Sequence, residues 1–207
     1  MEYFRPEHLS TSLVGIGVAD GADLFGVLSA AYSEPGRYYH TQKHIDECLA
    51  HFGPVRGLAE HPCEVDIAIW FHDAVYDTHR DDNEEMSAAW AKVFLDGKGA
   101  DEDVVQRIVE MILATRAHGD AQGDTVLVVH VDLGILGSPI DAFETYDAAI
   151  GREYAWVPQA QYREGRARVL QAFLDRPHIY HTQWFRDRYE AQARDNLLRK
   201  LAELTAS

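Results

Sequence analysis

Apolar side chains recur every three or four residues along most of the chain, the pattern of amphipathic helices that bury one face. Proline and glycine interrupt the pattern and leave segments of helical length between them. Thr41 suits the N-cap of one helix, and Pro62 suits the first turn of another. The pattern predicts helices over residues 21–33, 41–52, 62–77, 82–97, 101–118, 140–154, 158–175 and 182–205.

One segment, residues 125–136, is ambiguous. Its sequence TVLVVHVDLGIL is rich in β-branched residues and locally resembles a strand. A lone strand among helices would leave its backbone donors and acceptors without partners. We therefore predict a helix here and an all-α fold, with an α/β protein as the alternative.

The composition is that of a folded globular chain. Hydrophobic residues make up 46% of the 207 residues, and this length suits one domain. The two cysteines, Cys48 and Cys63, form no CxxC pair, and we expect reduced thiols in a cytoplasmic protein. The first residues do not resemble a signal peptide, and no apolar run approaches the roughly 20 residues that span a bilayer.

The charge limits the classes of partner. The chain has 34 acidic and 19 basic residues, a formal charge of −15. This balance disfavours nucleic acid polymers and anionic membrane surfaces, since both require clustered lysine and arginine. A small anionic substrate remains compatible, because a bound cation and a few arginines can reverse the local field.

Three polar features interrupt the apolar pattern. The first is the dyad His72-Asp73, and the second is His44, which lies four residues after His40 and beside apolar positions. The third is Asp132 inside an apolar run, where a carboxylate is costly to bury without a cation or hydrogen-bond partners. Each feature alone is also compatible with a satisfied core residue, a cap or a surface pair.

Together these features form an ordered set. His72 follows His44 by 28 positions, and Asp132 follows Asp73 by 59. This His, His-Asp, Asp order resembles the HD-domain superfamily, whose ligands come from separate helices of a bundle. The chain is most similar to a bacterial subgroup of predicted metal-dependent HD phosphohydrolases, through RYYHTQKHI, AIWFHDAVYDT, DNEEMSA, DLGILG, YREGRARVLQAFLDRPHIYHT and ARDNLL. The resemblance covers about residues 20–204.

The resemblance implies the architecture and the metal ligands. It implies one HD-type helical domain over 1–207, with a metal-binding core at about 20–140 and C-terminal helices at about 140–205 packed on it. The implied ligands are His44, His72, Asp73 and Asp132, a donor set that suits Mn, Fe, Ni, Co, Mg or Zn. In this family the ion activates a water and polarises a phosphoryl oxygen, and Asp73 can also orient that water.

Two further carboxylates are catalytic candidates. HDAVYDT is similar to the HDxxED stretch of (p)ppGpp hydrolases, with Tyr76 at the Glu position and Asp77 matching the Asp. Glu84 is a candidate to replace the missing glutamate. The alternative for Glu84 and Glu85 is an acidic first helical turn favoured by the helix dipole.

Candidates for substrate binding lie on both sides of the dyad. We assign this role to His40, Arg152, Arg166 and Arg194, since guanidinium groups bind phosphate in a bidentate manner. Each arginine can instead form a structural ion pair, and His40 can serve as a surface residue or a hydrogen-bond partner of a ligand. His118 is either a ligand of a second metal or a residue at a helix C-terminus.

The sequence therefore predicts a metal-dependent phosphohydrolase that acts on a small phosphorylated molecule, such as a nucleotide, through metal-activated water. The alternatives are an HD-scaffold oxygenase or lyase and a non-catalytic, metal-stabilised nucleotide-binding module. We expect no nucleic acid polymer and no membrane as partners. The amphipathic C-terminal segment can serve a homodimer or close the core of the monomer.

Overall fold

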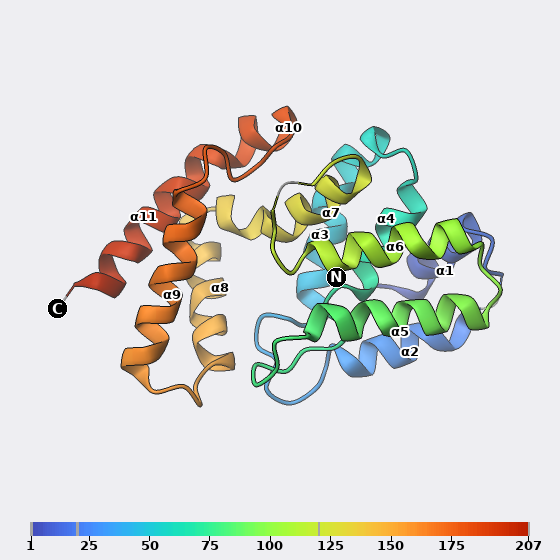
Figure 1. The fold of residues 1–207 in the computed structure, drawn as a ribbon, viewed down its shortest axis with the longest axis horizontal. Helices are drawn as coiled ribbons and strands as arrows, with labels where there is room; N and C mark the ends of the chain where they lie inside the picture. Colours follow the sequence, from blue (N-terminus) through green and yellow to red (C-terminus); the bar gives the residue numbers. More distant parts are fainter. Residues whose placement is uncertain (1, 20, 120, 207) are drawn as a thin grey trace. The chain divides into compact units, whose positions relative to one another are not determined.

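The computed structural model describes residues 2–19, 21–119 and 121–206, and all regular elements within them are helices (Figure 1). The prediction of an all-α fold is confirmed. The chain divides into two compact units, Met1–Asp132 and Leu133–Ser207, and each is described here by itself. Among the described residues no single helix is long and apolar enough to cross a membrane. One pair of segments, Asp124–Gly137 and Ile140–Glu153, reaches the required length and hydropathy in combination, but the two are bent by 105° relative to each other.

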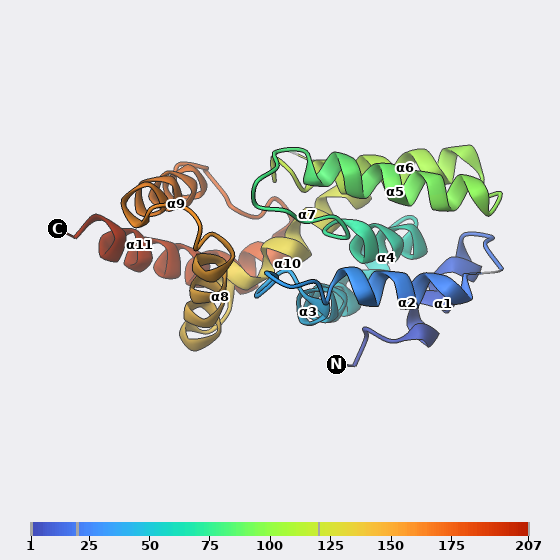
Figure 2. The same cartoon turned by 90° about the horizontal axis from the view of Figure 1, so that it is seen from below.

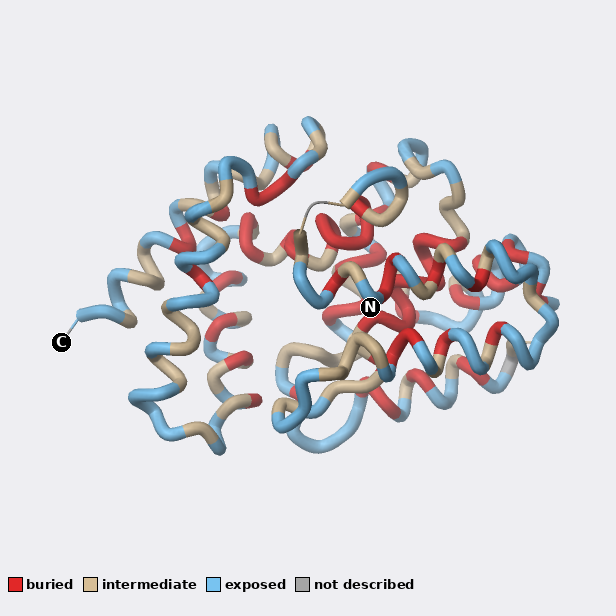
Figure 3. The backbone as a smooth tube through the Cα atoms, viewed as in Figure 1, coloured by how far each residue is buried: buried red, intermediate tan, exposed pale blue. Residues whose placement is uncertain are grey.

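The N-terminal unit is a bundle around one helix, α4, that is buried over nearly its whole length. Its elements are α1 (Pro6–Gly15), α2 (Ala22–Ala31), α3 (Gln42–Phe52), the short η1 (Gly53–Leu58), α4 (Pro62–Phe71), α5 (Asn83–Gly97), α6 (Glu102–Ala114) and α7 (Asp124–Asp132). Helices α5 and α6 run side by side in both views (Figures 1 and 2). Helix α4 packs against α1, α3, α6 and α7, and residues 64–72 are all buried (Figure 3).

Helix α4 ends earlier than predicted. The dense apolar run predicted a helix over 62–77, whereas α4 ends at Phe71 and a turn carries His72 and Asp73. The guanidinium of Arg37 donates to the carbonyl oxygens of Asp73 at 2.7 Å and Ala74 at 3.0 Å. These bonds satisfy carbonyl groups that a longer helix would have used, so the chain can leave the helix without an unpaired buried acceptor.

The ambiguous segment forms helix α7. Residues 126–131 are all buried, and this burial outweighs the local strand preference of their β-branched side chains. Asp124 fixes the start of α7, because its carboxylate accepts from the backbone N–H groups of Glu60 at 2.8 Å and His61 at 2.7 Å. This anchoring ties α7 to the loop before α4 and aligns the ends of both helices.

The N-terminal residues, which precede the predicted metal-binding core at about 20–140, contribute to the hydrophobic core of this unit. Leu9 and Leu13 of α1 are buried against α4, as is Phe4, whose ring contacts Trp70 in a tilted arrangement with centroids 4.6 Å apart. The carboxylate of Asp46 accepts from the backbone N–H of Phe4 at 2.8 Å and so holds this segment to α3.

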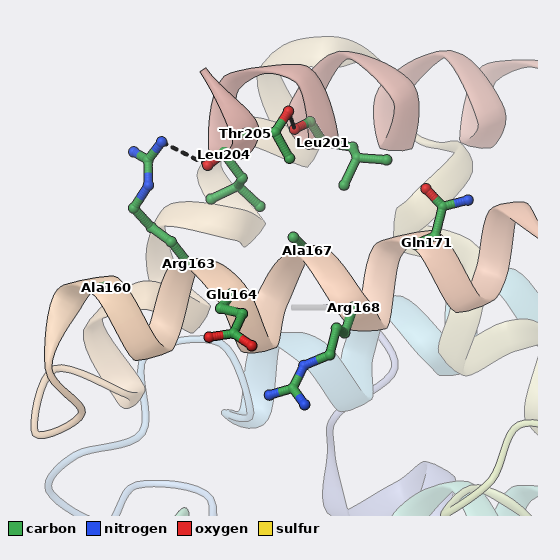
Figure 4. Close-up of a pocket in the computed structure, with 9 residues that line it drawn as sticks. All are labelled: Ala160, Arg163, Glu164, Ala167, Arg168, Gln171, Leu201, Leu204 and Thr205. Carbon is green, nitrogen blue, oxygen red and sulfur yellow. Dashed lines mark hydrogen bonds between the residues drawn. The ribbon is translucent and has the colours of Figure 1, made fainter. Parts of the chain in front are cut away.

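The C-terminal unit contains η2 (Leu133–Gly137), α8 (Ile140–Glu153), α9 (Gln159–Leu174), α10 (Gln183–Phe185), the π-helical turn η3 (Arg186–Glu190) and α11 (Ala191–Thr205). The helix predicted over 182–205 is thus interrupted by a π turn. Buried Asn196 donates to the carbonyl oxygens of Leu136 and Ser138, both at 2.9 Å, and joins α11 to η2. Figure 4 shows the facing sides of α9 and α11, where Arg163 donates to the Leu204 carbonyl oxygen at 2.6 Å.

Candidate metal centre

Four side chains from three helices of the N-terminal unit meet at one place. His44 lies in the first turn of α3, His72 and Asp73 follow the end of α4, and Asp132 ends α7. Adjacent residues within a helix point about 100° apart, so His72 and Asp73 can converge because they lie in the turn after α4. The position of Asp132 at a helix end likewise frees its carboxylate to face the other three residues.

The donor atoms lie at the separations that a bound ion requires. His44 Nε2 is 3.1 Å from His72 Nε2, 3.3 Å from Asp73 Oδ2 and 3.2 Å from Asp132 Oδ1. His72 Nε2 is 3.1 Å from Asp73 Oδ2 and 3.5 Å from Asp132 Oδ1. Ligands about 2.0–2.2 Å from an ion are themselves about 3.0–3.5 Å apart in tetrahedral or octahedral geometry. The geometry therefore fits one divalent ion.

The hydrogen bonding of His72 prepares its ring for a metal. Its Nδ1 lies 2.9 Å from the carbonyl oxygen of Ile69 and donates to it, which leaves the Nε2 lone pair directed at the centre. This arrangement is usual for metal-binding histidines. Since the Nε2 atoms of His44 and His72 are 3.1 Å apart, they cannot both carry a proton directed at the other.

The carboxylates of the centre are ionised. Burial alone would raise the pKa of Asp73, but the imidazoles of His72, His40 and His44 hold it well below its usual range. Burial also opposes ionisation of Asp132, yet its bonds to His118, His44 and His72 hold its pKa well below the ordinary value. A cluster with two carboxylates whose side chains are only 15% and 16% exposed therefore requires positive charge beside it.

The two imidazoles of the centre have raised pKa values. Burial would lower the pKa of His44, but Cys48, Tyr39 and the two carboxylates raise it well above its ordinary value. The pKa of His72 is likewise raised, against burial, chiefly by Asp73 and Asp132. The shift of His72 reflects the attraction of the two carboxylates for positive charge, and the same carboxylates contribute to the shift of His44 after Cys48 and Tyr39. A divalent ion would supply that charge without placing two protons between neighbouring imidazoles.

His118 holds the outer oxygen of Asp132. It lies four residues beyond the end of α6, with a φ of 46° in the left-handed region that non-glycine residues rarely adopt. Its Nε2 is 2.6 Å from Asp132 Oδ2, which leaves Oδ1 facing His44 and His72. Asp132 is thus arranged to offer one oxygen to an ion.

His40 lies at the edge of the centre rather than on α3. The helix begins at Gln42 with Thr41 in the N-cap position, although no hydrogen bond from the Thr41 side chain caps it. His40 stacks on Tyr76 with ring centroids 4.0 Å apart, and its Nε2 is 4.0 Å from Asp73 Oδ2. His40 therefore lies between Tyr76 and the carboxylate of Asp73 without belonging to α3.

Two residues at the centre were not assigned a role from the sequence. Arg37 is almost fully buried and donates to the backbone of the dyad, as described above, and also to the carbonyl oxygen of His40 at 3.2 Å. Cys48 lies one turn after His44 and belongs with His44, His72 and Asp132 to a group whose ligand atoms lie within 4.8 Å of one another. The apolar neighbours of Cys48 gave it the pattern of an ordinary core residue.

The other carboxylate candidates lie outside this cluster of donors. Asp77 is exposed and accepts from the backbone N–H and the imidazole of His79, which together lower its pKa. Glu84 is half-buried in the first turn of α5, and its neighbour Glu85 pairs with Arg116.

The three arginines assigned to phosphate binding belong to the C-terminal unit. Arg166 forms an ion pair with Asp147 at 2.9 Å, and Arg194 pairs with Glu190 at 2.7 Å and donates to carbonyl oxygens after α9. Arg152 is exposed in the last turn of α8. Both paired arginines thus have the structural ion-pair partners that the acid-rich sequence offered as the alternative.

Comparison of the chain with family models, curated proteins and solved structures finds no match. The functional argument therefore rests on the geometry of the centre and on the residues that form it.

Proposed function

We propose that this protein is a metal-dependent hydrolase of the HD-domain type. In this proposal His44, His72, Asp73 and Asp132 hold a divalent ion, and the substrate is a phosphate ester or anhydride in a small molecule such as a nucleotide. The observation that carries the proposal is the convergence of four donor atoms. The Nε2 atoms of His44 and His72 are 3.1 Å apart, and each lies 3.1–3.5 Å from one oxygen of Asp73 and one oxygen of Asp132. The order of these residues along the chain, which resembles HD proteins, supports the same ligand set.

A bound ion of this kind would supply Lewis acidity to a water and to a phosphoryl oxygen. The protein itself supplies orientation and charge. Asp73 is ionised and lies 4.0 Å from His40 Nε2, and in this proposal it orients a water and accepts its proton. The hydrogen bond from His118 orients the carboxylate of Asp132. The stacked rings of His40 and Tyr76 lie beside Asp73.

Asp77 and Glu84 remain candidates for later proton transfers. Asp77 is anchored through its backbone N–H to the Asn83 side chain at 3.0 Å, so the loop after the dyad has a defined conformation. We expect substitution of Asp73 to abolish turnover, whereas Asp77→Asn and Glu84→Gln should lower kcat and leave the metal content unchanged.

Metal analysis is the first test. Protein purified without added metal or chelator is compared with His72→Ala and with His178→Ala, which replaces an exposed histidine of the C-terminal unit. We expect about one equivalent of metal in the wild type and in His178→Ala, and none in His72→Ala. Failure of the folded wild type to bind Mn, Co, Ni or Zn would overturn the proposed centre.

A hydrolysis screen across nucleotides and sugar phosphates follows with the same three proteins. Release of phosphate by the wild type and by His178→Ala, but not by His72→Ala, would support the proposed reaction. Turnover retained in metal-free His72→Ala would refute it. Metal and nucleotide binding without any turnover would replace the hydrolase with a metal-stabilised binding module.

A further inference from the structure

Helix α9 of the C-terminal unit leaves an open groove beside α11. Leu170 is the one buried residue among the 16 of α9, although a helix of this length normally buries a stripe of apolar residues along one face. The groove has a volume of about 540 Å³, and its walls are mainly apolar (Figure 4). Ala160 and Ala167 line it from α9, and Leu201 and Leu204 line it from α11. The groove therefore offers apolar surface that the chain itself leaves open to solvent.

Two opposite charges border the groove. Glu164 and Arg168 also line it from α9, where both are exposed, and their spacing of four residues places them on one face of the helix. Among the described residues neither side chain has an ion-pair partner, whereas Arg163 donates to the carbonyl oxygens of Leu204 and Ala206 at the end of α11. Glu164 and Arg168 are thus available to a partner that carries the opposite pattern of charges.

The net charge of the C-terminal unit favours a second copy of this chain as that partner. Residues 133–207 contain ten basic and ten acidic residues, out of 19 basic and 34 acidic residues in the whole chain. The formal charge of −15 therefore belongs entirely to residues 1–132. Surfaces with a net charge near zero associate more readily than strongly charged ones, because like charges repel. Two C-terminal units can therefore approach each other with little net repulsion, unlike two N-terminal units.

We propose that the groove between α9 and α11 binds the same groove of a second copy and so forms a symmetric homodimer. A two-fold axis that crosses α9 at right angles near residue 166 runs the two α9 helices antiparallel. Glu164 of each copy then lies opposite Arg168 of the other, and α9 of each copy covers the apolar groove of the other. A parallel arrangement would instead oppose like charges, so the charge pattern selects the antiparallel one. This inference is independent of the proposed metal centre.

Charge reversal tests this interface directly. Sedimentation equilibrium over a concentration series gives the dimer Kd of the full-length wild type, of Glu164→Arg, of Arg168→Glu and of the variant with both substitutions. Each single reversal opposes like charges at both symmetry-related contacts, so the Kd should rise on the order of tenfold or more. The double variant restores opposite charges across the interface and should return the Kd close to the wild-type value. Lys92→Glu and Asp96→Arg are the controls, since they reverse the charges of an exposed pair with the same spacing on α5 and should leave the Kd unchanged.

Three results would overturn the inference. A wild type that is monomeric throughout the series would exclude a second copy as the occupant, and binding of an apolar dye to that monomer would assign the groove to a small apolar ligand instead. An unchanged Kd in both single variants would place the dimer interface elsewhere. Dissociation of both single variants without recovery in the double variant would show that the two charges do not pair across the interface. Because Glu164 and Arg168 are exposed, their substitution should leave the fold intact, which circular dichroism checks.

Discussion

Arg37 connects the stability of the N-terminal unit to its metal centre. Its side chain is 2% exposed, and Nη1 donates to the carbonyl oxygens of Asp73 at 2.7 Å and His40 at 3.2 Å. Nη2 donates to the carbonyl oxygen of Ala74 at 3.0 Å. One guanidinium thus joins the turn that carries the His-Asp dyad to the turn that precedes α3. We predict that Arg37→Ala destabilises the fold and displaces Asp73.

The magnitude follows from the bonds that are lost. A hydrogen bond from a charged donor contributes about 1.5–3 kcal/mol, so the two shorter bonds, to Asp73 and Ala74, together contribute about 3–6 kcal/mol. The guanidinium also lies over the ring of buried Tyr32, with Cζ 5.3 Å from the centroid, which adds about 0.5–1 kcal/mol. Water that enters the vacated space can satisfy part of the loss. We therefore expect a decrease of about 3–5 kcal/mol in the free energy of unfolding.

Urea denaturation followed by circular dichroism measures this quantity, and competition with a chelating dye measures the metal affinity of the folded protein. Arg37→Lys should recover only part of the stability. It keeps the positive charge, but one ammonium cannot reach both carbonyl oxygens in the geometry of the guanidinium. Arg80→Ala is the control, since it removes an exposed arginine whose side chain pairs with nearby Asp82. Its unfolding free energy and metal affinity should match the wild type.

Two results would contradict this reasoning. A loss in Arg37→Ala below about 1 kcal/mol would mean that the carbonyl oxygens find other partners at little cost. A large loss of stability with an unchanged metal Kd would mean that Arg37 supports the fold without positioning Asp73. The expected weakening of metal binding is about tenfold, typical of residues that orient metal ligands.

Two further predictions concern other parts of the molecule. Burial of His8 lowers its pKa below the ordinary 6.5, against the opposing pull of Asp66, so His8 disfavours the folded state as the pH falls from 6.5 through the lowered pKa. In denaturation series at several pH values, His8→Gln should lose less stability over this window than the wild type, and parallel curves would contradict the assignment. In the C-terminal unit, Asn196→Ala leaves the carbonyl oxygens of Leu136 and Ser138 without their donor. The free energy of unfolding, measured by thermal or urea denaturation, should fall by about 2–4 kcal/mol. A decrease below about 1 kcal/mol would show that water replaces the amide.

The helices could be predicted from the sequence because their apolar spacing reflects burial on one face. The start of α3 at Gln42 and of α5 at Asn83 are each within one residue of the predicted positions. The end of α4 could not be predicted, since it depends on Arg37, which lies 35 residues before His72 in the sequence. Apolar periodicity continues past Phe71, and only a tertiary contact shows where the helix stops.

The order of the His, His-Asp, Asp set along the chain suggested that these four residues converge. The positions of two neighbouring residues, Cys48 and His118, could not be predicted from the sequence. Cys48 has the sequence pattern of a core residue, and only the geometry shows that its sulfur lies beside His44. His118 approaches Asp132 because its backbone adopts φ 46°, a conformation that the surrounding sequence does not specify. Arg166 shows the reverse case, since its guanidinium suits phosphate but the structure pairs it with Asp147.

If the proposed function holds, the centre would give this acid-rich chain a favourable electrostatic field for an anionic substrate. Its formal charge of −15 would repel a phosphate at most points of the surface. At the centre, however, two carboxylates are compensated locally by imidazoles and, in our proposal, by a divalent ion. The field near a buried ion is set by its immediate neighbours more than by distant surface charges, which salt screens within about 8–10 Å. In the proposed function, selectivity for a small anion would therefore follow from the same donors that hold the ion, without a basic surface.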